Sequence, residues 1–326
     1  MINRTLLIII IISLSFCELY SQKNNGYVYF STVNNNINDI CFSKEGGVLA
    51  IPDGEVIKVY STVDHKIISE FIDGHTNKIL TLKISKDSSM LISGGKDSTV
   101  VIWDFIQRIL INKLKFHKGM ITALDISPDS KYMASGSTDG EVIIYDLIEK
   151  KQIHDFNEQS KNTITAIEFS PDGKLLAVAG IDGLIKLYDM NNGQILTSLN
   201  GHKGWVRDIS FNNIQTKLIS CGDDSNIVMW NISDIHNIHQ QNKEKNGGFA
   251  WVLSIDYCGD NSTFATGDIN GNVKIYSSYC GYHVKVRKPI NKILFKPNDK
   301  GYIKVAIATR GEGVILIDAI NMKSKK

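Results

Sequence analysis

The chain carries almost no excess charge of either sign. Lysine and arginine total 36 residues and aspartate and glutamate total 34, so the net charge of the 326 residues is only +2. Proteins that bind nucleic acid or anionic membranes through charge need a basic face or tail, and this composition provides no such field. We therefore expect no nucleic-acid partner.

Cysteine is scarce as well, with five residues in the chain. One is Cys17, near the N-terminus, and the other four are scattered singly. This spacing excludes a disulfide framework of the kind that stabilises small exported domains. Cys41 and Cys221 lie in apolar runs, which predicts buried free thiols, whereas a bridge between Cys258 and Cys280 is left open.

The chain also lacks an apolar run of the ~20 residues that span a bilayer. The run Leu6–Leu14 is shorter, follows Arg4 and precedes small and polar residues around Ser21, which is the layout of a secretory signal peptide. We expect residues 1–21 to be a signal peptide and the protein to be secreted, periplasmic or extracellular. An uncleaved anchor or lipidation at Cys17 is the alternative, and would be the only link to a membrane.

Helical periodicity is missing from the remainder, and short β-type runs take its place. TLKIS, MLIS and TVVIW are alternating or continuously β-branched, and they are separated by turn sequences such as SPDG and TDG. The runs form one unit that recurs seven times. The residue that ends the third strand of each unit lies 41 to 46 residues after its predecessor, at Tyr60, Trp103, Tyr145, Tyr188, Trp230, Tyr276 and Ile317.

This period is typical of β-propeller blades. A single four-stranded sheet cannot bury both of its faces, whereas radial stacking of seven sheets buries them and leaves only short edges. We predict an all-β fold, a seven-bladed β-propeller of four-stranded antiparallel blades, over residues 22–326.

Three short motifs recur within the units. They are GH at Gly74-His75 and Gly201-His202, SPD at Ser127–Asp129 and Ser170–Asp172, and WD or a variant of it at Trp103-Asp104, Tyr145-Asp146 and Tyr188-Asp189. By these motifs the chain resembles the WD-repeat β-propellers from Gly26 to Lys326. The resemblance implies that the early strand Tyr27–Ser31 completes the seventh blade and closes the ring.

One candidate for chemistry is the trio His202, Ser220 and Asp224, which contains the residue types of a nucleophilic triad. The same types recur at the same offsets in units two and three, whereas a catalytic triad needs one nucleophile in one pocket. We predict no catalytic residue. The resemblance implies instead a buried hydrogen-bond chain that ties a turn to the sheet. Its members would be His75, Ser93, Asp97 and Trp103 in unit two, His117, Ser135, Asp139 and Tyr145 in unit three, and His202, Ser220, Asp224 and Trp230 in unit five.

The resemblance also implies a partner-binding face at one mouth of the central channel. Residues near the start of each first strand and the residue before each turn aspartate would line it: Trp205, Arg207, Asp223, Trp251, Leu253 and Ile269 in units five and six, with Lys78 and Met120 from units two and three. Tryptophan and arginine are enriched at interface hot spots. We hypothesise that Trp205 and Trp251 form an aromatic patch that holds a peptide or protein, the alternative being that both pack between blades.

Other candidate sites are weaker. Asp234, His236 and His239 have a spacing that can ligate a metal, but no further ligand pair is evident. The glycine-rich elements lack the strand-to-helix context and the lysine of a phosphate loop. We predict neither a metal nor a cofactor, and we interpret residues 236–248 as a long loop on the partner-binding face.

Together these features predict an exported, non-enzymatic protein-interaction scaffold. Two other functions stay open, a hydrolase that uses the channel and a binder of carbohydrate or another small ligand. Acidic or metal-binding residues converging at the channel mouth would favour the hydrolase, and the sequence gives no sign of them. The partner's identity and the oligomeric state are not encoded in any motif.

Overall fold

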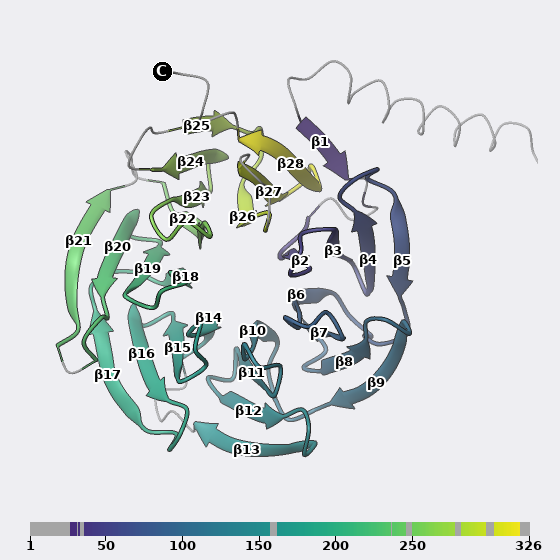
Figure 1. Ribbon diagram of the computed structural model, residues 1–326, viewed down its shortest axis with the longest axis horizontal. Coiled ribbons are helices and arrows are strands. Elements are labelled where there is room, and N and C mark those ends of the chain that lie inside the picture. Colours follow the sequence, from purple (N-terminus) through teal and green to yellow (C-terminus); the bar gives the residue numbers. More distant parts are fainter. Residues whose placement is uncertain are drawn as a thin grey trace, which may run out of the picture.

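The computed structural model describes residues 27–30, 32, 36–156, 162–235, 237–245, 250–277, 282–297 and 303–319. These residues form seven four-stranded antiparallel sheets arranged as blades around a central axis, and among them there is no helix (Figure 1). The prediction of a seven-bladed all-β propeller is confirmed.

Each blade runs from an inner strand beside the axis to an outer strand at the periphery. In the first four blades the strands, from inner to outer, are β2 (Cys41–Phe42), β3 (Val48–Asp53), β4 (Val56–Ser61) and β5 (Ile67–Phe71); β6 (Ile79–Ile84), β7 (Met90–Gly95), β8 (Val100–Asp104) and β9 (Ile109–Leu114); β10 (Ile121–Ile126), β11 (Tyr132–Ser137), β12 (Val142–Asp146) and β13 (Lys151–Phe156); and β14 (Ile164–Phe169), β15 (Leu175–Gly180), β16 (Leu184–Asp189) and β17 (Ile195–Asn200).

The fifth and sixth blades follow the same order. Their strands are β18 (Val206–Phe211), β19 (Lys217–Gly222), β20 (Asn226–Asn231) and β21 (His239–Lys245), then β22 (Val252–Tyr257), β23 (Phe264–Asp268), β24 (Asn272–Tyr276) and β25 (Tyr282–Lys285). The seventh blade consists of β26 (Ile290–Phe295), β27 (Ile303–Thr309), β28 (Val314–Ala319) and, as its outer strand, β1 (Tyr27–Phe30).

Strand β1 closes the ring. It pairs antiparallel with β28, in a register that places Tyr27 opposite Ile317 and Phe30 opposite Val314 (Figure 1). The last blade is therefore built from both ends of the described chain, as expected from the early strand. This pairing covers the edge that β28 would otherwise expose.

The hydrophobic core lies between neighbouring blades. One cluster joins Ile185 and Leu187 of β16 to Val206 and Trp230 of the fifth blade, all of them at most 3% exposed. The β-branched and leucine side chains on both faces of the middle strands supply such layers, which explains why these strands read as nearly continuous apolar runs. The layers hold the blades at fixed positions around the axis.

The inner strands share an irregularity that shapes the channel. In six blades the register with the next strand shifts after the first residue of the inner strand, so that the second residue forms a β-bulge. A bulge re-aims the extra side chain and bends the strand. The bulged residues are Leu80, Thr122, Thr165, Arg207, Leu253 and Asn291, and all of them line the channel.

The segment interpreted as a loop at 236–248 is largely a strand. Residues His239–Lys245 form β21 and pair with β20 along their whole length, with His239 opposite Asn231 and Lys245 opposite Asn226. The loop prediction was wrong because an outer strand has one solvated edge and needs little apolar alternation. Residues 236 and 246–249 lie outside the described residues.

Two other predictions can be placed only in part. Residues 1–21 with Cys17, and Cys280 of the possible bridge, lie outside the described residues. Cys41 and Cys221 are buried free thiols, as predicted. Within the described part of the chain, no helix has the length and apolarity needed to cross a membrane.

Candidate functional site at the channel mouth

The second and fifth blades each contain a buried hydrogen-bond chain. In the fifth blade His202 Nδ1 lies 2.9 Å from Asp224 and its Nε2 lies 2.8 Å from Ser220 Oγ, to which Trp230 Nε1 donates at 3.0 Å. The second blade repeats these contacts with His75, Ser93, Asp97 and Trp103, at 3.1, 2.8 and 2.9 Å.

The direction of the chain follows from the chemistry of its ends. The Asp224 carboxylate can only accept, so His202 donates from Nδ1; its Nε2 then accepts from Ser220, whose oxygen accepts in turn from Trp230. Ser220 is completely buried between these partners. A hydroxyl enclosed in this way has no access to a substrate, and the arrangement connects the turn at Asp224 to the sheet.

The carboxylates of these chains are held ionised by donors from the turn. Burial opposes ionisation of Asp97, but the Thr76 N–H and His75 outweigh burial and lower the pKa of the carboxyl. Burial lowers the pKa of His75 in spite of the adjacent Asp97, so the imidazole is neutral at pH 7.

The third blade departs from the prediction at Tyr145. His117 contacts Asp139 at 3.3 Å and Ser135 at 2.9 Å, but the Tyr145 hydroxyl interacts with Asn112 of the neighbouring blade instead of Ser135. A phenol carries its polar atom at the tip of the ring, beyond the place where an indole N–H sits. The chain in this blade therefore ends at Ser135.

The glycine of the GH motif is explained by the same tryptophan. A Cβ on Gly74 would lie 2.2 Å from the Trp103 ring, and one on Gly201 would lie 2.6 Å from the Trp230 ring, so both indoles need a glycine there. In the third blade Phe116 takes the glycine position, and its ring centroid lies 5.8 Å from that of Tyr145. The smaller tyrosine ring leaves space that Phe116 fills.

A cluster of two tryptophans and an arginine lies at the channel mouth. Trp205 and Trp251 precede β18 and β22 and are 45% and 44% exposed. The Arg207 guanidinium lies 4.6 Å from the Trp205 ring centroid and 5.9 Å from that of Trp251. Asp223 holds the guanidinium in a fork, with contacts of 2.6 Å to Nε and 2.7 Å to Nη2. Such contacts fix side chains that would otherwise be mobile.

The backbone places these residues at equivalent positions in successive blades. The Trp205 carbonyl accepts the Asp223 N–H, and the Trp251 carbonyl accepts the Ile269 N–H, each at 3.0 Å. The same bond joins Lys96 to Lys78 and Thr138 to Met120. The predicted positions therefore lie on one rim, although Lys78 and Met120 stand on other blades than the tryptophans.

The mouth encloses a cavity of about 350 Å³. It is lined by Trp205, Arg207 and Leu253 of the predicted set, while Lys78, Met120, Asp223, Trp251 and Ile269 stand outside its wall. Leu253 is buried, whereas Met120 is exposed. The lining residues that sequence reasoning did not assign to the site include Arg310, Asn38 and Asn291.

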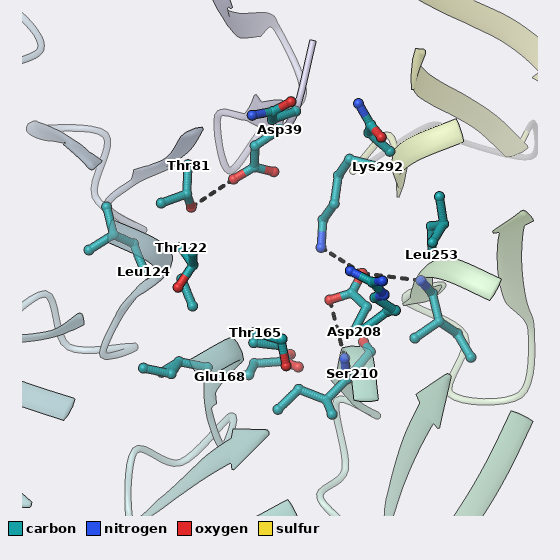
Figure 2. A pocket seen from close by; sticks show the side chains of 18 of the residues that line it. Asp39, Thr81, Thr122, Leu124, Thr165, Glu168, Asp208, Ser210, Leu253 and Lys292 are labelled. Atoms are coloured by element: carbon teal, nitrogen blue, oxygen red, sulfur yellow. Dashed lines mark hydrogen bonds and ion pairs between the residues drawn. The ribbon is translucent and has the colours of Figure 1, made fainter. Parts of the chain in front are cut away.

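A second cavity of about 150 Å³ continues down the channel and contains charged residues that the sequence reasoning missed. Figure 2 shows Asp39, Glu168, Asp208 and Lys292 pointing into it from different blades. Lys292 of the seventh blade reaches past the sixth to contact Asp208 of the fifth at 2.8 Å. The expectation from the sequence concerned acidic residues only at the channel mouth, whose cavity has no carboxylate among the described residues of its wall; these carboxyls lie in the cavity that continues down the channel.

Each channel carboxyl accepts a backbone N–H from the next blade. The pairs are Asp39 with Leu82 at 3.1 Å, Asp125 with Phe169 at 2.8 Å, Glu168 with Phe211 at 3.2 Å, Asp208 with Ile255 at 3.1 Å and Asp256 with Phe295 at 2.7 Å. An inner strand has an edge with unpaired N–H groups, and a carboxylate of the neighbouring blade satisfies them. The acidic residues thus join blade to blade.

The protonation states differ within this set. Burial, with Asp125 nearby, raises the pKa of Glu168 well above its ordinary value. Burial also raises the pKa of Asp256 to about 7, against the N–H bond from Phe295. For Lys83, burial opposes the charge, but Asp125 and Asp39 outweigh it and raise the pKa of the amine. The channel therefore holds two acids of raised pKa close to a lysine whose charge is favoured.

Candidate metal ligands in the described residues are already engaged. His117, Asp139 and Glu141 place one ligand atom each within 4.8 Å of one another. Both nitrogens of His117 are hydrogen-bonded, and Asp139 accepts N–H bonds from Lys118 and Glu141. His239 is exposed on β21 with Nδ1 at 3.0 Å from the Asn237 carbonyl, and its predicted companion His236 lies outside the described residues.

Comparison with known proteins agrees with this architecture. A family model described as "IFT122 first beta-propeller" matches residues 36–317. The guanine nucleotide-binding protein subunit beta of Schizosaccharomyces pombe is 32% identical over 77 residues, which are 24% of this chain and 25% of that protein. The U4/U6 small nuclear ribonucleoprotein PRP4 of Saccharomyces cerevisiae is 38% identical over 73 residues, 22% of this chain and 16% of that protein. The alignments thus span a quarter or less of these relatives.

Proposed function

The chain belongs to the WD-repeat β-propeller family, and from this membership we propose that it is an exported, non-catalytic scaffold that holds a peptide or protein partner at the mouth of its channel. The observation that carries the proposal is the pair of half-exposed tryptophans fixed around Arg207. Large apolar side chains held rigid at a rim supply contact area at little entropic cost.

The inner faces of the indoles are not the binding surface. The Arg207 guanidinium lies against both rings, 4.6 Å from the Trp205 centroid and 5.9 Å from that of Trp251, so a sugar ring or a peptide side chain would have to displace it to stack on those faces. Both side chains remain nearly half exposed, and Trp205 also lines the mouth cavity. This arrangement favours an apolar contact between the exposed parts of the two indoles and an extended peptide segment. It disfavours the stacking of a carbohydrate between the rings.

Two relatives carry names that place them in assemblies. One is a subunit of a guanine nucleotide-binding protein and the other is part of a small nuclear ribonucleoprotein. A role for this chain in holding other proteins is consistent with them. The proposed export rests on residues 1–21 alone, and N-terminal sequencing of the protein recovered outside the producing cells tests it: a start near residue 22 supports export, and an intact Met1 on intracellular protein refutes it.

The test of the binding face uses a double variant and a matched control. We expect Trp205→Ala with Trp251→Ala to fold like the wild type and to lose at least tenfold in affinity for a co-purified partner, measured by titration calorimetry. The control replaces Ile106 and Ile148, which are 73% and 67% exposed in turns between third and outer strands, at the opposite end of the blades. Equal binding by wild type and the tryptophan variant would place the partner elsewhere.

A second candidate is hydrolysis inside the channel. The observation that favours it is Glu168, whose pKa burial raises well above its ordinary value, in one cavity with Asp208, which lies 2.8 Å from Lys292, since a general acid needs a carboxyl of raised pKa. A screen of glycoside, ester and peptide substrates with wild type and Glu168→Gln decides between the two. Turnover by the wild type that the variant lacks would replace the scaffold proposal.

A further inference from the structure

The wall of the mouth cavity has two unlike sides. The third to sixth blades contribute its apolar residues, Trp205, Ile181, Ile164 and Leu253, together with threonines and Arg207, whereas the seventh and first blades contribute only the polar Arg310, Asn291 and Asn38. The cavity of about 350 Å³ is large enough for one or two side chains of a partner. A segment that fills it meets both sides at once.

Two cations stand at this side, Arg310 in the cavity wall and Lys78 outside the wall next to Asn38, and both donate hydrogen bonds to neutral oxygens. Arg310 Nε donates to Asn291 Oδ1 at 2.7 Å, and Lys78 Nζ donates to the Asn36 carbonyl at 2.6 Å and lies 3.5 Å from Asn38 Oδ1. Neither cation forms an ion pair with any described residue. Amide and carbonyl oxygens orient a cation without neutralising it, so both remain able to pair with an anion.

Arg207 differs from these two cations. Asp223 already neutralises its guanidinium through two hydrogen bonds. The rim beside the cavity therefore has an excess of positive charge on the side of Arg310, Lys78 and Lys96. Burial together with Lys96 lowers the pKa of Lys78, which means that a nearby anion would relieve an unfavourable charge.

We propose that this cavity receives an acidic side chain of the partner, with its carboxylate paired to Arg310 in the wall and attracted by Lys78 beside the wall, and the apolar residue next to it packed against Trp205. This inference rests on the proposed function and adds the chemical class of the partner, a peptide segment in which aspartate or glutamate adjoins an aliphatic or aromatic residue.

The carboxylate stops at the mouth and does not descend the channel. Below the rim, Asp39 and Asp208 face the channel, and the only cation that contacts Asp208 within the described residues, Lys292, is engaged with it at 2.8 Å. Lys83 also lines that cavity and is paired with Asp125 at 3.4 Å, so a second anion at that depth would compete with Asp208 and Asp125 for cations that are already paired. The binding site for the acid is thus bounded by the Asn38 and Asn291 amides.

The test is a selection from random peptides. A phage library of 12-residue peptides is selected on the immobilised full chain, on Arg310→Leu and on Arg287→Leu. Arg287 is exposed and lies outside the cavity wall, so its removal changes the net charge equally. Enriched peptides are then synthesised with amidated C-termini, so that only side chains supply carboxylates, and each is paired with a version in which Glu or Asp becomes Gln or Asn.

We expect the wild type and Arg287→Leu to enrich an acidic residue beside an apolar one, and the amide version to bind at least tenfold more weakly, with this preference lost in Arg310→Leu. Neutral or basic peptides that bind through Trp205 and Trp251 would overturn the acidic inference and leave the proposed function standing. Peptides whose affinity is unchanged by Trp205→Ala with Trp251→Ala, or a selection without enrichment, would overturn both.

Discussion

The buried serine of each hydrogen-bond chain gives the sharpest test of the scaffold. Ser220→Ala removes a hydroxyl that serves both His202 and Trp230, so it leaves two buried polar groups without a partner. Ser135→Ala leaves one, because Tyr145 is bonded elsewhere. Each buried polar group left without a hydrogen-bond partner lowers the free energy of unfolding by about 1 to 3 kcal/mol. We therefore expect Ser220→Ala to destabilise the fold by about 1 to 3 kcal/mol more than Ser135→Ala.

The assay is urea unfolding at pH 7 followed by far-UV circular dichroism, which does not depend on the tryptophans. A double-mutant cycle isolates the hydrogen bond between Trp230 and Ser220. Ser220→Ala and Trp230→Phe should show a coupling free energy of about 1 to 3 kcal/mol, since the Ser220 variant leaves no unpaired indole N–H once Trp230 is replaced. The cycle of Ser135→Ala with Tyr145→Phe should show coupling near zero. Equal costs of the two serine variants, or strong coupling at Tyr145, would refute the assignment of the chain.

Further perturbations test other parts of the molecule. The pKa of Asp256 is about 7 in the folded state, against an ordinary 3.8. Between pH 3.8 and 7 the folded state therefore binds a proton that the unfolded state has released, and the contribution of Asp256 to the free energy of unfolding falls as the pH rises through this range. Asp256→Asn should therefore match the wild type near pH 4 and exceed it above pH 7 by at most about 4 kcal/mol in unfolding titrations; a pH-independent difference would contradict this. His202→Ala should lower the melting temperature while folded protein keeps its partner affinity, and an unchanged melting temperature with lost binding would reverse the structural interpretation. Deleting residues 1–30 removes β1 and uncovers the edge of β28, so gel filtration should show more self-association than for the full chain, and an unchanged elution with unchanged stability would show that the closure is dispensable.

The fold could be predicted because its evidence repeats. Each third-strand residue from Tyr60 to Ile317 lies on the third strand of its blade, and the strand at Tyr27 closes the ring. These positions depend on the alternation of apolar and polar residues and on burial between blades, and every repeat of the sequence carries both signals. An error in predicting one turn therefore does not change the predicted number or order of the blades.

The channel carboxyls escaped prediction for a physical reason. Lys83, Asp125, Glu168 and Asp256 all occupy the fifth position of an inner strand, a signal that aligning the units makes visible. Polar residues at alternate positions of a strand normally indicate a solvated face, and only closure of the ring brings this face inside. Their bonds to backbone N–H groups of the next blade need the angle between blades, which a sequence pattern does not contain.

Repetition itself separates structural from functional positions in this chain. Where a residue type recurs with its partners, as with His75 and His202, the contacts tie a turn to a sheet. In the second to seventh blades the rim residue before the inner strand is Lys78, Met120, Thr163, Trp205, Trp251 and Pro289, so only the fifth and sixth blades share a residue type. The rim carbonyl accepts the same backbone N–H bond in all six of these blades, so this bond makes no demand on the side chain. Side chains at such positions are available for a partner, and the one pair of neighbouring blades that share a large exposed side chain there are the two that carry tryptophan.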